Sequence, residues 1–377
     1  MSHTDIISRV LYLPRVCAAT LKVHMLNSFL SLFTHDIGID LGTANTLVYV
    51  RGKGIVIREP SIIARHKKTK EILAVGRQAK RMEGRTPQTI ETVRPLKDGV
   101  IADFDATTSM LTHFIREVHE RPGGTKRVGF PKIPRPRIIV GIPSDVTEVE
   151  RRAVQEAALS AGARQAYLIE EPMAAAIGAG MSVEEPGGIF VVDIGGGTTE
   201  IAVISLGGIV LNRGLRIAGD EMDEAIIAYL RMRYSLLIGQ GTAEELKHNI
   251  GSALPRKPEL VTVVRGRDLE TGLPKSIKIT SLEIREALSP VIQQITARVS
   301  ETLEESPPEL VSDIMERGIL LAGGGSLIRG IDQFMAEQVG IPVWIADDPL
   351  TAVTRGTAKV LENPRLLAKV RVTGGLR

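Results

Sequence analysis

The amino-acid sequence predicts an α/β fold made of two duplicated lobes, each with a smaller inserted subdomain. Three observations lead to this prediction: the length of the chain, its alternation of strand-like and helix-like segments, and one internal repeat. A chain of 377 residues is too long for one ordinary hydrophobic core, so two lobes are expected. Strands that alternate with helices are typical of sheets covered by helices.

The predicted strands are runs of apolar residues bounded by turn-forming residues. They are residues 37–50, 137–142, 167–170, 189–205, 318–321 and 342–345. An amphipathic helix is predicted from Asp105 to Glu120, where apolar side chains recur on one stripe. Thr147 and Glu150 have the spacing of a capping box, which predicts a second helix that ends near Gly162.

The internal repeat is the most informative pattern in the chain. Residues 38–48 read GIDLGTANTLV, and residues 191–201 read VVDIGGGTTEI. Each stretch is an apolar strand that ends in an aspartate, then a tight turn of glycine and small residues, then a second apolar strand. Two equivalent hairpins predict two equivalent lobes.

Two segments, 64–105 and 213–277, are richer in charged residues, proline and glycine, so we expect them to be the insertions. The expected order is an N-terminal extension (1–35), lobe I core (36–63), lobe I insertion (64–105), lobe I core (106–176), lobe II core (177–212), lobe II insertion (213–277), lobe II core (278–344) and a return to lobe I core (345–377).

Composition argues against several functions. Cys17 is the only cysteine, so no intramolecular disulfide and no cysteine-based metal site can form, which fits a reducing cytosol. Aromatic residues make up only 3% of the chain, which leaves little surface for base stacking, so we expect no nucleic-acid partner. None of the seven histidines falls in an HExxH spacing, and we expect no metal held by the protein alone.

The glycine turns predict a site for a nucleotide polyphosphate. Such a ligand needs many backbone N–H donors without bulky side chains, which turns at Gly42 and at residues 195–197 can supply. Asp40 and Asp193 end the strands before these turns, where each can hold waters around a Mg²⁺ ion that arrives with the nucleotide. The chain has no GxxxxGK[ST] loop and no GxGxxG at 195–197, which argues against P-loop and Rossmann sites. Either turn alone could be a structural β-hairpin.

A third glycine cluster follows an apolar strand and precedes a helix that bears Ile331 and Phe334. Three consecutive glycines let the backbone lie against a flat ring, so we expect this turn to contact adenosine. A helix-entry turn is the structural alternative, but a cap needs fewer glycines. The residues concerned are Gly323, Gly324, Gly325, Ser326 and Leu327.

Two phosphate hairpins followed by an adenosine turn resemble the superfamily of actin, the sugar kinases and the large heat-shock chaperones. Longer segments, spread from residue 36 almost to the end, are similar to motifs of the MreB family of bacterial actins. They are residues 36–46, 94–104, 170–180, 193–200 and 219–226. The resemblance implies an actin-like ATPase fold that holds ATP or ADP with Mg²⁺ in a central cleft.

The resemblance also implies roles for individual residues. The residues expected at the phosphates, beside Gly42, are Thr43, Ala44 and Asn45 from lobe I and Gly195, Gly196 and Gly197 from lobe II. The segment that the family uses against ribose and adenine is matched here by Glu244, Glu245, Leu246 and Lys247. Glu244 and Lys247 share one face of the predicted helix. A solvated ion pair between them is the alternative.

Slow hydrolysis of ATP is a further implication. Glu171 stands at a predicted helix start beside the cleft, where the family positions the water that attacks the γ-phosphate, and Thr198 would assist. Neighbouring Glu170 could be the active carboxylate instead, and the sequence separates the two poorly. Glu171 is our prediction.

In the family, subunits add head to tail, a contact that continues without closing and so makes a filament. We therefore expect self-assembly coupled to weak ATPase activity, control of rod-type cell shape and wall synthesis, and contact with membrane-bound morphogenesis proteins. The expected location is the cytoplasm, at the inner face of the cell membrane. A metabolite kinase, a chaperone ATPase and a nucleotide-binding scaffold that does not hydrolyse ATP are the competing interpretations.

Two segments are candidates for contact with an anionic membrane. Residues 25–33 carry apolar side chains on one side of a predicted helix, and in the loop 121–137 apolar residues lie among basic ones. The residues expected to contact lipid are Leu26, Phe29, Leu30, Leu32, Phe33, Val128 and Phe130. Packing against a lobe and a solvated basic loop are the respective alternatives. Either Met1 or Met25 could be the start of translation.

Overall fold

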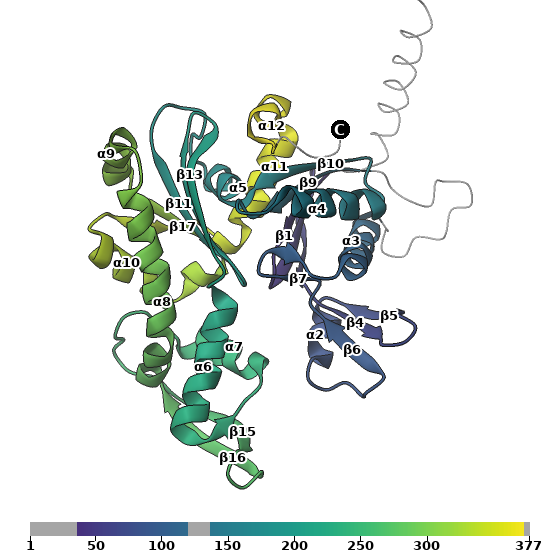
Figure 1. Ribbon diagram of the computed structural model, residues 1–377, viewed down its shortest axis with the longest axis vertical. Helices are drawn as coiled ribbons and strands as arrows, with labels where there is room; N and C mark the ends of the chain where they lie inside the picture. Colours follow the sequence, from purple (N-terminus) through teal and green to yellow (C-terminus); the bar gives the residue numbers. More distant parts are fainter. Residues whose placement is uncertain (1–35, 120–135, 373–377) are drawn as a thin grey trace, which may run out of the picture.

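The computed structural model describes residues 36–119 and 136–372, and it has two lobes that lie side by side (Figure 1). All seven side chains expected to contact lipid lie outside the described residues. Within the described part of the chain, no helix has both the length and the apolar character that a membrane crossing requires.

Lobe I is built on a five-stranded sheet with the order β10-β9-β1-β2-β3. Its strands are β1 (Ile37–Leu41), β2 (Asn45–Val50), β3 (Gly54–Pro60), β9 (Arg137–Ile142) and β10 (Gln165–Glu170). The first three are antiparallel neighbours, and β9 and β10 continue the sheet parallel to β1. Because successive side chains point to opposite faces, Ile138 and Val140 pack in one core with α3 (Phe104–His119) and α4 (Glu148–Ser160), whereas Ile139 belongs to another.

Lobe II repeats this sheet strand for strand, in the order β13-β12-β11-β17-β18. Its strands are β11 (Ile189–Ile194), β12 (Thr199–Ser205), β13 (Gly208–Leu215), β17 (Ile319–Ala322) and β18 (Val343–Ile345). One face packs in a core with helices of the same lobe, which are α6 (Gly219–Tyr234), α8 (Ser281–Glu304), α9 (Pro308–Arg317) and α10 (Ile331–Val339). The matching strand orders confirm the predicted duplication.

Each lobe also carries a small three-stranded sheet at its outer end, seen at the bottom of Figure 1. In lobe I it consists of β4 (Ile63–His66), β5 (Ile72–Val75) and β6 (Ile90–Val93), with α2 (Arg77–Met82); the hairpin of β7 (Leu96–Lys97) and β8 (Val100–Ile101) follows. In lobe II it consists of β14 (Leu236–Leu237), β15 (Val261–Asp268) and β16 (Pro274–Thr280), next to α7 (Gln240–Ile250). The division of the whole chain into eight segments stays a proposal.

Two helices cross between the large sheets and join the lobes. α5 (Glu171–Gly178) follows β10 of lobe I, and α11 (Ala352–Glu362), with α12 (Pro364–Val370) after it, returns from lobe II. A Cβ atom at Gly178 would lie 1.8 Å from the carbonyl oxygen of Ala352, and one at Gly356 would lie 1.8 Å from that of Ala174. The two backbones therefore touch, and only glycine allows this crossing.

The predicted elements are present, with small shifts at their ends. The segments 37–50 and 189–205 each form a hairpin, as predicted. The capping box is confirmed, because Thr147 N–H donates to the Glu150 carboxylate at 2.7 Å and Glu150 N–H donates to Thr147 Oγ1 at 3.3 Å. The strand expected from 318 begins one residue later, since Gly318 has a φ of 79°, which strand residues do not adopt.

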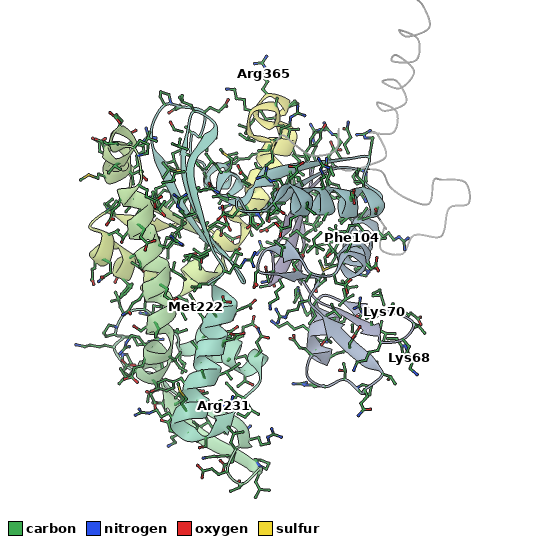
Figure 2. The ribbon with its side chains drawn as sticks, in the orientation of Figure 1. Lys68, Lys70, Phe104, Met222, Arg231 and Arg365 are labelled. Atoms are coloured by element: carbon green, nitrogen blue, oxygen red, sulfur yellow. The ribbon has the colours of Figure 1, made fainter. Side chains whose placement is uncertain are left out.

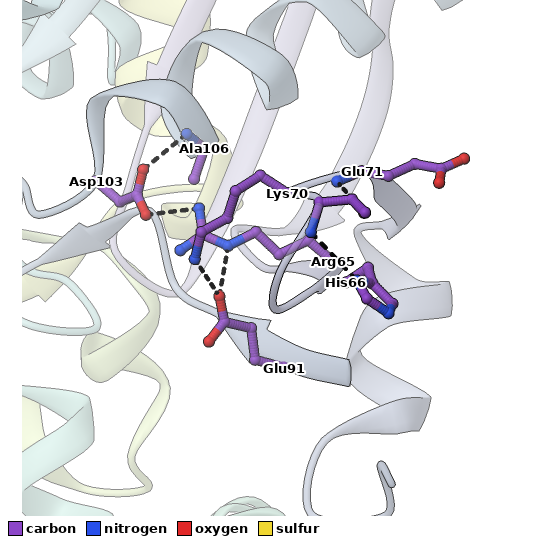
Figure 3. A network of polar contacts seen from close by, with 8 residues as sticks. Arg65, His66, Lys70, Glu71, Glu91, Asp103 and Ala106 are labelled. Atoms are coloured by element: carbon purple, nitrogen blue, oxygen red, sulfur yellow. Dashed lines mark hydrogen bonds and ion pairs between the residues drawn. The ribbon is translucent and has the colours of Figure 1, made fainter. Parts of the chain in front are cut away.

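A polar network fastens the small sheet of lobe I to the rest of the lobe (Figure 3). The guanidinium of Arg65 on β4 lies 2.7 Å from the carboxylate of Glu91 on β6 and 2.8 Å from that of Asp103. Asp103 in turn accepts the N–H of Ala106 at 2.9 Å, in the first turn of α3. One arginine thus ties two strands of the insertion to a helix of the lobe core.

Candidate functional site

A cavity of about 710 Å³ lies between the lobes, and it is lined by residues from both. Its walls come from the two repeated hairpins, the third glycine turn at η2 (Gly324–Leu327), the short η3 (Pro349–Thr351), and the helices α2, α6 and α7. Met222 lines the cavity from the upper part of α6, while Arg231 projects from farther down the same helix (Figure 2). The two copies of the repeat predicted from sequence therefore both line one cavity between the lobes.

The two hairpin turns are in contact at the closed end of this space. A Cβ at Gly196 would lie 2.5 Å from Cβ of Ala44, and one at Gly197 would lie 3.0 Å from Cγ2 of Thr43. A side chain at Gly196 would therefore force the two turns apart, and one at Gly197 would be tightly packed, so the turn surface is mainly backbone. Gly197 is buried in this contact, whereas Gly42, Thr43, Ala44, Asn45, Gly195 and Gly196 line the cavity.

Beneath the turns lie acidic side chains close enough to repel one another. Burial, together with the charge of Asp193, raises the pKa of Asp40 to about 8, although Thr354 Oγ1 donates a hydrogen bond to it at 3.5 Å. Burial raises the pKa of Asp193 to about 7. Their pKa values are raised because ionised carboxylates are unfavourable when buried beside each other, and a nearby cation would stabilise the ionised forms. The pair therefore fits a hydrated Mg²⁺ bound with phosphate.

Glu171 begins α5 and lines the same cavity, whereas Glu170 is not among the lining residues. Burial, and then the charges of Asp40, Asp193 and Glu200, raise the pKa of Glu171 well above its usual range. Thr198 lines the cavity from the opposite lobe. The two residues predicted for catalysis therefore line the same cavity.

The third glycine turn is held tightly against the end of β11. Gly323 has a φ of 77°, and a Cβ there would lie 2.3 Å from the carbonyl oxygen of Ile194. Ser326 is buried and donates its hydroxyl to the Gly323 carbonyl at 2.7 Å, so it shapes the turn from behind. Gly323, Gly324, Gly325 and Leu327 line the cavity.

On α7, the predicted residues divide between cavity, core and solvent. Glu244 and Lys247 line the cavity, Leu246 is buried in the lobe II core, and Glu245 is exposed. Glu244 and Lys247 each have another partner. Lys247 Nζ lies 2.9 Å from Asp223 and donates to the Gly219 carbonyl at 2.7 Å, and Glu244 pairs at 2.5 Å with Lys80 of the opposite lobe.

Sequence reasoning missed several residues of this cavity. Lys80, Arg94, Asp220, Asp223, His248, Arg256 and Arg329 all line it. None of these residues belongs to a glycine motif. Most come from the insertions, where the spacing of residues does not indicate which side chains line the cavity. In the sequence, Asp223 was marked only as part of the 219–226 segment. In the structure, burial raises the pKa of Asp223 to about 6, and the charge of Lys247 opposes this shift.

Two duplicated lobes with glycine hairpins that face each other across a cleft define the class of actin-like ATPase folds. The chain belongs to the MreB/Mbl protein family, whose model matches residues 34–369.

Several named proteins are similar to this chain. It is 53% identical over 342 residues to the cell shape-determining protein MreB of Escherichia coli K12, and the aligned region covers 90% of this chain and 96% of that protein. It is 45% identical to the cell shape-determining protein Mbl of Bacillus subtilis over 91% of this chain and 100% of that protein.

Solved structures agree with the fold. The crystal structure of MreB5 of Spiroplasma citri bound to ADP has a TM-score of 0.82 and 41% identity, covering 89% of this chain and 98% of its own, and the same values hold for the AMPPNP-bound form. A MamK double helical filament, at 22% identity and a TM-score of 0.72, is alike in fold and covers 87% of this chain and 99% of its own.

Proposed function

We propose that this chain is a cytoskeletal ATP-binding protein that polymerises into membrane-associated filaments and directs rod-type cell shape and wall synthesis. Hydrolysis of ATP is slow and serves the dynamics of the filament. The observation that carries the proposal is the contact of the two hairpin turns over the acids Asp40 and Asp193, at the closed end of a cavity shared by both lobes.

ATP lies in this cavity with its phosphates between the hairpins. Backbone N–H groups of residues 42–45 and 196–197 donate to the phosphate oxygens, since these turns carry little side-chain bulk, and the N–H of Gly195 closes its own turn by donating to the Thr198 carbonyl at 2.8 Å. The turn at 323–327 lies against the adenine ring, and Glu244 and Lys247 contact the ribose and base. Asp40 and Asp193 are the residues that would hold a hydrated Mg²⁺ ion, which would neutralise charge on the phosphates.

Glu171 and Thr198 orient the attacking water. Phosphoryl transfer to water depends on in-line positioning more than on a strong base, so a single oriented water is sufficient for slow turnover. Glu171 accepts a hydrogen bond from that water once its carboxyl is ionised, which a cation beside Asp40 and Asp193 favours.

Nucleotide binding favours assembly because ATP touches both lobes and therefore binds the closed shape better than the open one. Closed subunits add head to tail, and the chain of contacts continues as a filament. The segments 25–33 and 121–137 attach this filament to the anionic inner face of the cell membrane, where membrane-bound morphogenesis proteins meet it.

The test is pelleting of the purified full-length chain with ATP and Mg²⁺, with and without anionic liposomes, followed by electron microscopy. We expect ATP-dependent filaments on lipid and slow release of phosphate. Failure to pellet, together with ADP formation stimulated by a member of a metabolite panel that is itself phosphorylated, would instead identify a metabolite kinase. Filaments without any phosphate release would identify a scaffold that does not hydrolyse ATP.

A further inference from the structure

A short segment of lobe I, residues 141–145, runs beside Glu171 at one end and packs on the turn at Gly99, which Thr198 also approaches. A Cβ at Gly141 would lie 3.5 Å from Cγ of Glu171, so the end of β9 runs directly beside that side chain. Two residues on, Pro143 packs on the turn at Gly99, where an added Cβ would lie 2.7 Å from Cγ of Pro143 and 3.1 Å from Cγ2 of Thr198. A shift of this segment would therefore shift both side chains relative to each other.

The other end of the same segment is held by lobe II. Ser144 N–H donates to Glu200 Oε2 on β12 at 3.2 Å. The carboxylate of Asp145 accepts two hydrogen bonds from β13, one from Asn212 Nδ2 at 3.0 Å and one from Gly214 N–H at 2.9 Å. We refer to these three hydrogen bonds as the clasp.

The residues that bind this segment in lobe II, Gly214 and Glu200, are themselves closely packed. A Cβ at Gly214 would lie 2.7 Å from Asp145 Oδ2, so a larger residue would push the carboxylate away. Glu200 is buried and stands opposite Asp193 in the register of β11 and β12. The clasp therefore connects the strand that bears Asp193 to the strand end beside Glu171.

None of the residues that form the clasp lines the cavity, so they would act on a bound nucleotide only through their neighbours. The lobes are joined covalently through α5 and α11, whose backbones are in contact where the two helices cross. The hydrogen bonds of Asp145 are a separate link between the lobes, and they join the segment that runs beside Glu171 to β13.

We propose that Asp145, with Asn212 and Gly214, is a positioning residue that sets the attack geometry for hydrolysis. This inference rests on the proposed function, because it concerns the placement of the water that Glu171 orients. Misplacement by about 1 Å can lower the rate of a positioned reaction by roughly 100-fold, so weakening the clasp should slow the chemical step and leave nucleotide affinity nearly unchanged.

The experiment exchanges the side chains of Asp145 and Asn212, which are hydrogen-bonded to each other. Asn212→Asp places two carboxylates against each other and should lower single-turnover phosphate release by roughly 10-fold, with ATP affinity within about 2-fold of wild type. The double variant Asp145→Asn with Asn212→Asp restores a donor opposite an acceptor, keeps an oxygen for Gly214 N–H, and should recover most of the rate. Arg152→Ala, which removes an exposed pair with Glu148 inside α4, is the matched control and should leave the rate unchanged.

Phosphate release that is unaltered in Asn212→Asp would overturn the proposal, and so would a loss that the double variant does not recover. A parallel fall in ATP affinity and melting temperature would also overturn it, because the clasp would then be only structural. A wild-type chain that binds ATP and releases no phosphate would remove the proposed hydrolysis together with this inference, whereas the other outcomes concern the clasp alone.

Discussion

Glu171 is placed by the start of α5, with Pro172 in the first turn, and its side chain runs beside the end of β9. Its carboxyl is close enough to Asp40, Asp193 and Glu200 for their charges to raise its pKa. The side chain thus has little freedom and a strongly polar neighbourhood.

Replacement of this carboxyl tests its assignment. Glu171→Gln keeps the shape and should lower phosphate release by roughly 100-fold, because the amide is a poorer acceptor for the water. ATP affinity should stay within about 3-fold, since the phosphates are held by backbone N–H groups. Glu170→Gln is the control, measured in the same single-turnover assay. A larger loss from Glu170→Gln would reverse the assignment.

At the scale of single residues, sequence reasoning works where a motif constrains the backbone. Asp40 and Asp193 could be found because each ends a strand before a glycine turn, and the two turns repeat. Lys80 and Asp145 could not be found, because their partners Glu244 and Asn212 are distant in the sequence and only the folded chain brings them together. A mutual ion pair of Glu244 and Lys247 was the alternative to nucleotide contact, but each of the two residues pairs with another group.

Among the elements, the crossing of α5 and α11 depends on two glycines. Gly178→Ala places a methyl group 1.8 Å from the Ala352 carbonyl oxygen, so the helices must separate. We expect a loss of about 2 kcal/mol or more in the free energy of unfolding, measured by denaturant melts. Gly241→Ala on α7 meets nothing within 4 Å and should be neutral or stabilising by about 0.5 kcal/mol. Equal effects of the two changes would contradict the close contact.

The Arg65 network gives a second prediction for the elements. Arg65 is mostly buried, and its removal leaves Glu91 and Asp103 without their shared partner. Arg65→Ala should therefore lower the free energy of unfolding by about 1–3 kcal/mol. Lys70→Ala removes a largely exposed pair with the same Glu91 and should cost less than about 0.5 kcal/mol. Thermal melts of both variants check this order, and a larger loss from Lys70→Ala would contradict it.

The elements themselves were largely predictable because their patterns are local. Alternating apolar residues marked the strands of both hairpins, and a capping box marked the start of α4. The small sheets were expected only as insertions, since strands such as β15 expose one face and carry charged residues among the apolar ones. Two of their pairings, β4 with β6 and β14 with β15, also join strands that are distant in the sequence, which local patterns do not reveal.

For the whole molecule, the acids of the cleft predict how stability responds to pH. The pKa values of Asp40 and Asp193 are raised from 3.8 to about 8 and about 7, so the folded state binds protons more tightly than the unfolded state. Their contribution to stability is therefore greatest at low pH and is lost as pH rises through about 7 to 8.

We expect the ligand-free protein to melt at a lower temperature at about pH 8.5 than at about pH 6. Mg²⁺ with ATP should reduce this difference, because a bound cation favours the ionised carboxylates. Asp193→Asn should reduce it in the ligand-free protein, for it removes one of the titrating groups. Calorimetry at both pH values checks this, and a melting temperature that rises with pH would contradict it.

The ion pair of Lys80 and Glu244 joins the two lobes across the cavity, and it predicts how nucleotide leaves. Lys80→Gln should speed the dissociation of a fluorescent ATP analogue by about 2- to 5-fold at low salt, and less at high salt, because the pair is partly exposed. Lys68→Gln, at the outer end of the same insertion (Figure 2), should leave dissociation unchanged. Equal rates for wild type and Lys80→Gln would show that this pair does not retain the nucleotide.

The contact between the backbones of α5 and α11 is also a point about which the two lobes could rotate, and parts of the molecule lie at different distances from it. Glu171 lies at the beginning of α5, close to this contact. The small sheet of lobe II lies at the far end of α6, whose 16 residues span roughly 24 Å. A rotation about this crossing that moves the Glu171 carboxylate, the proposed catalytic group, by a fraction of an ångström would move the far end of that sheet several times as far. Loss of one phosphate would in this way become a displacement large enough for an adjoining subunit to sense.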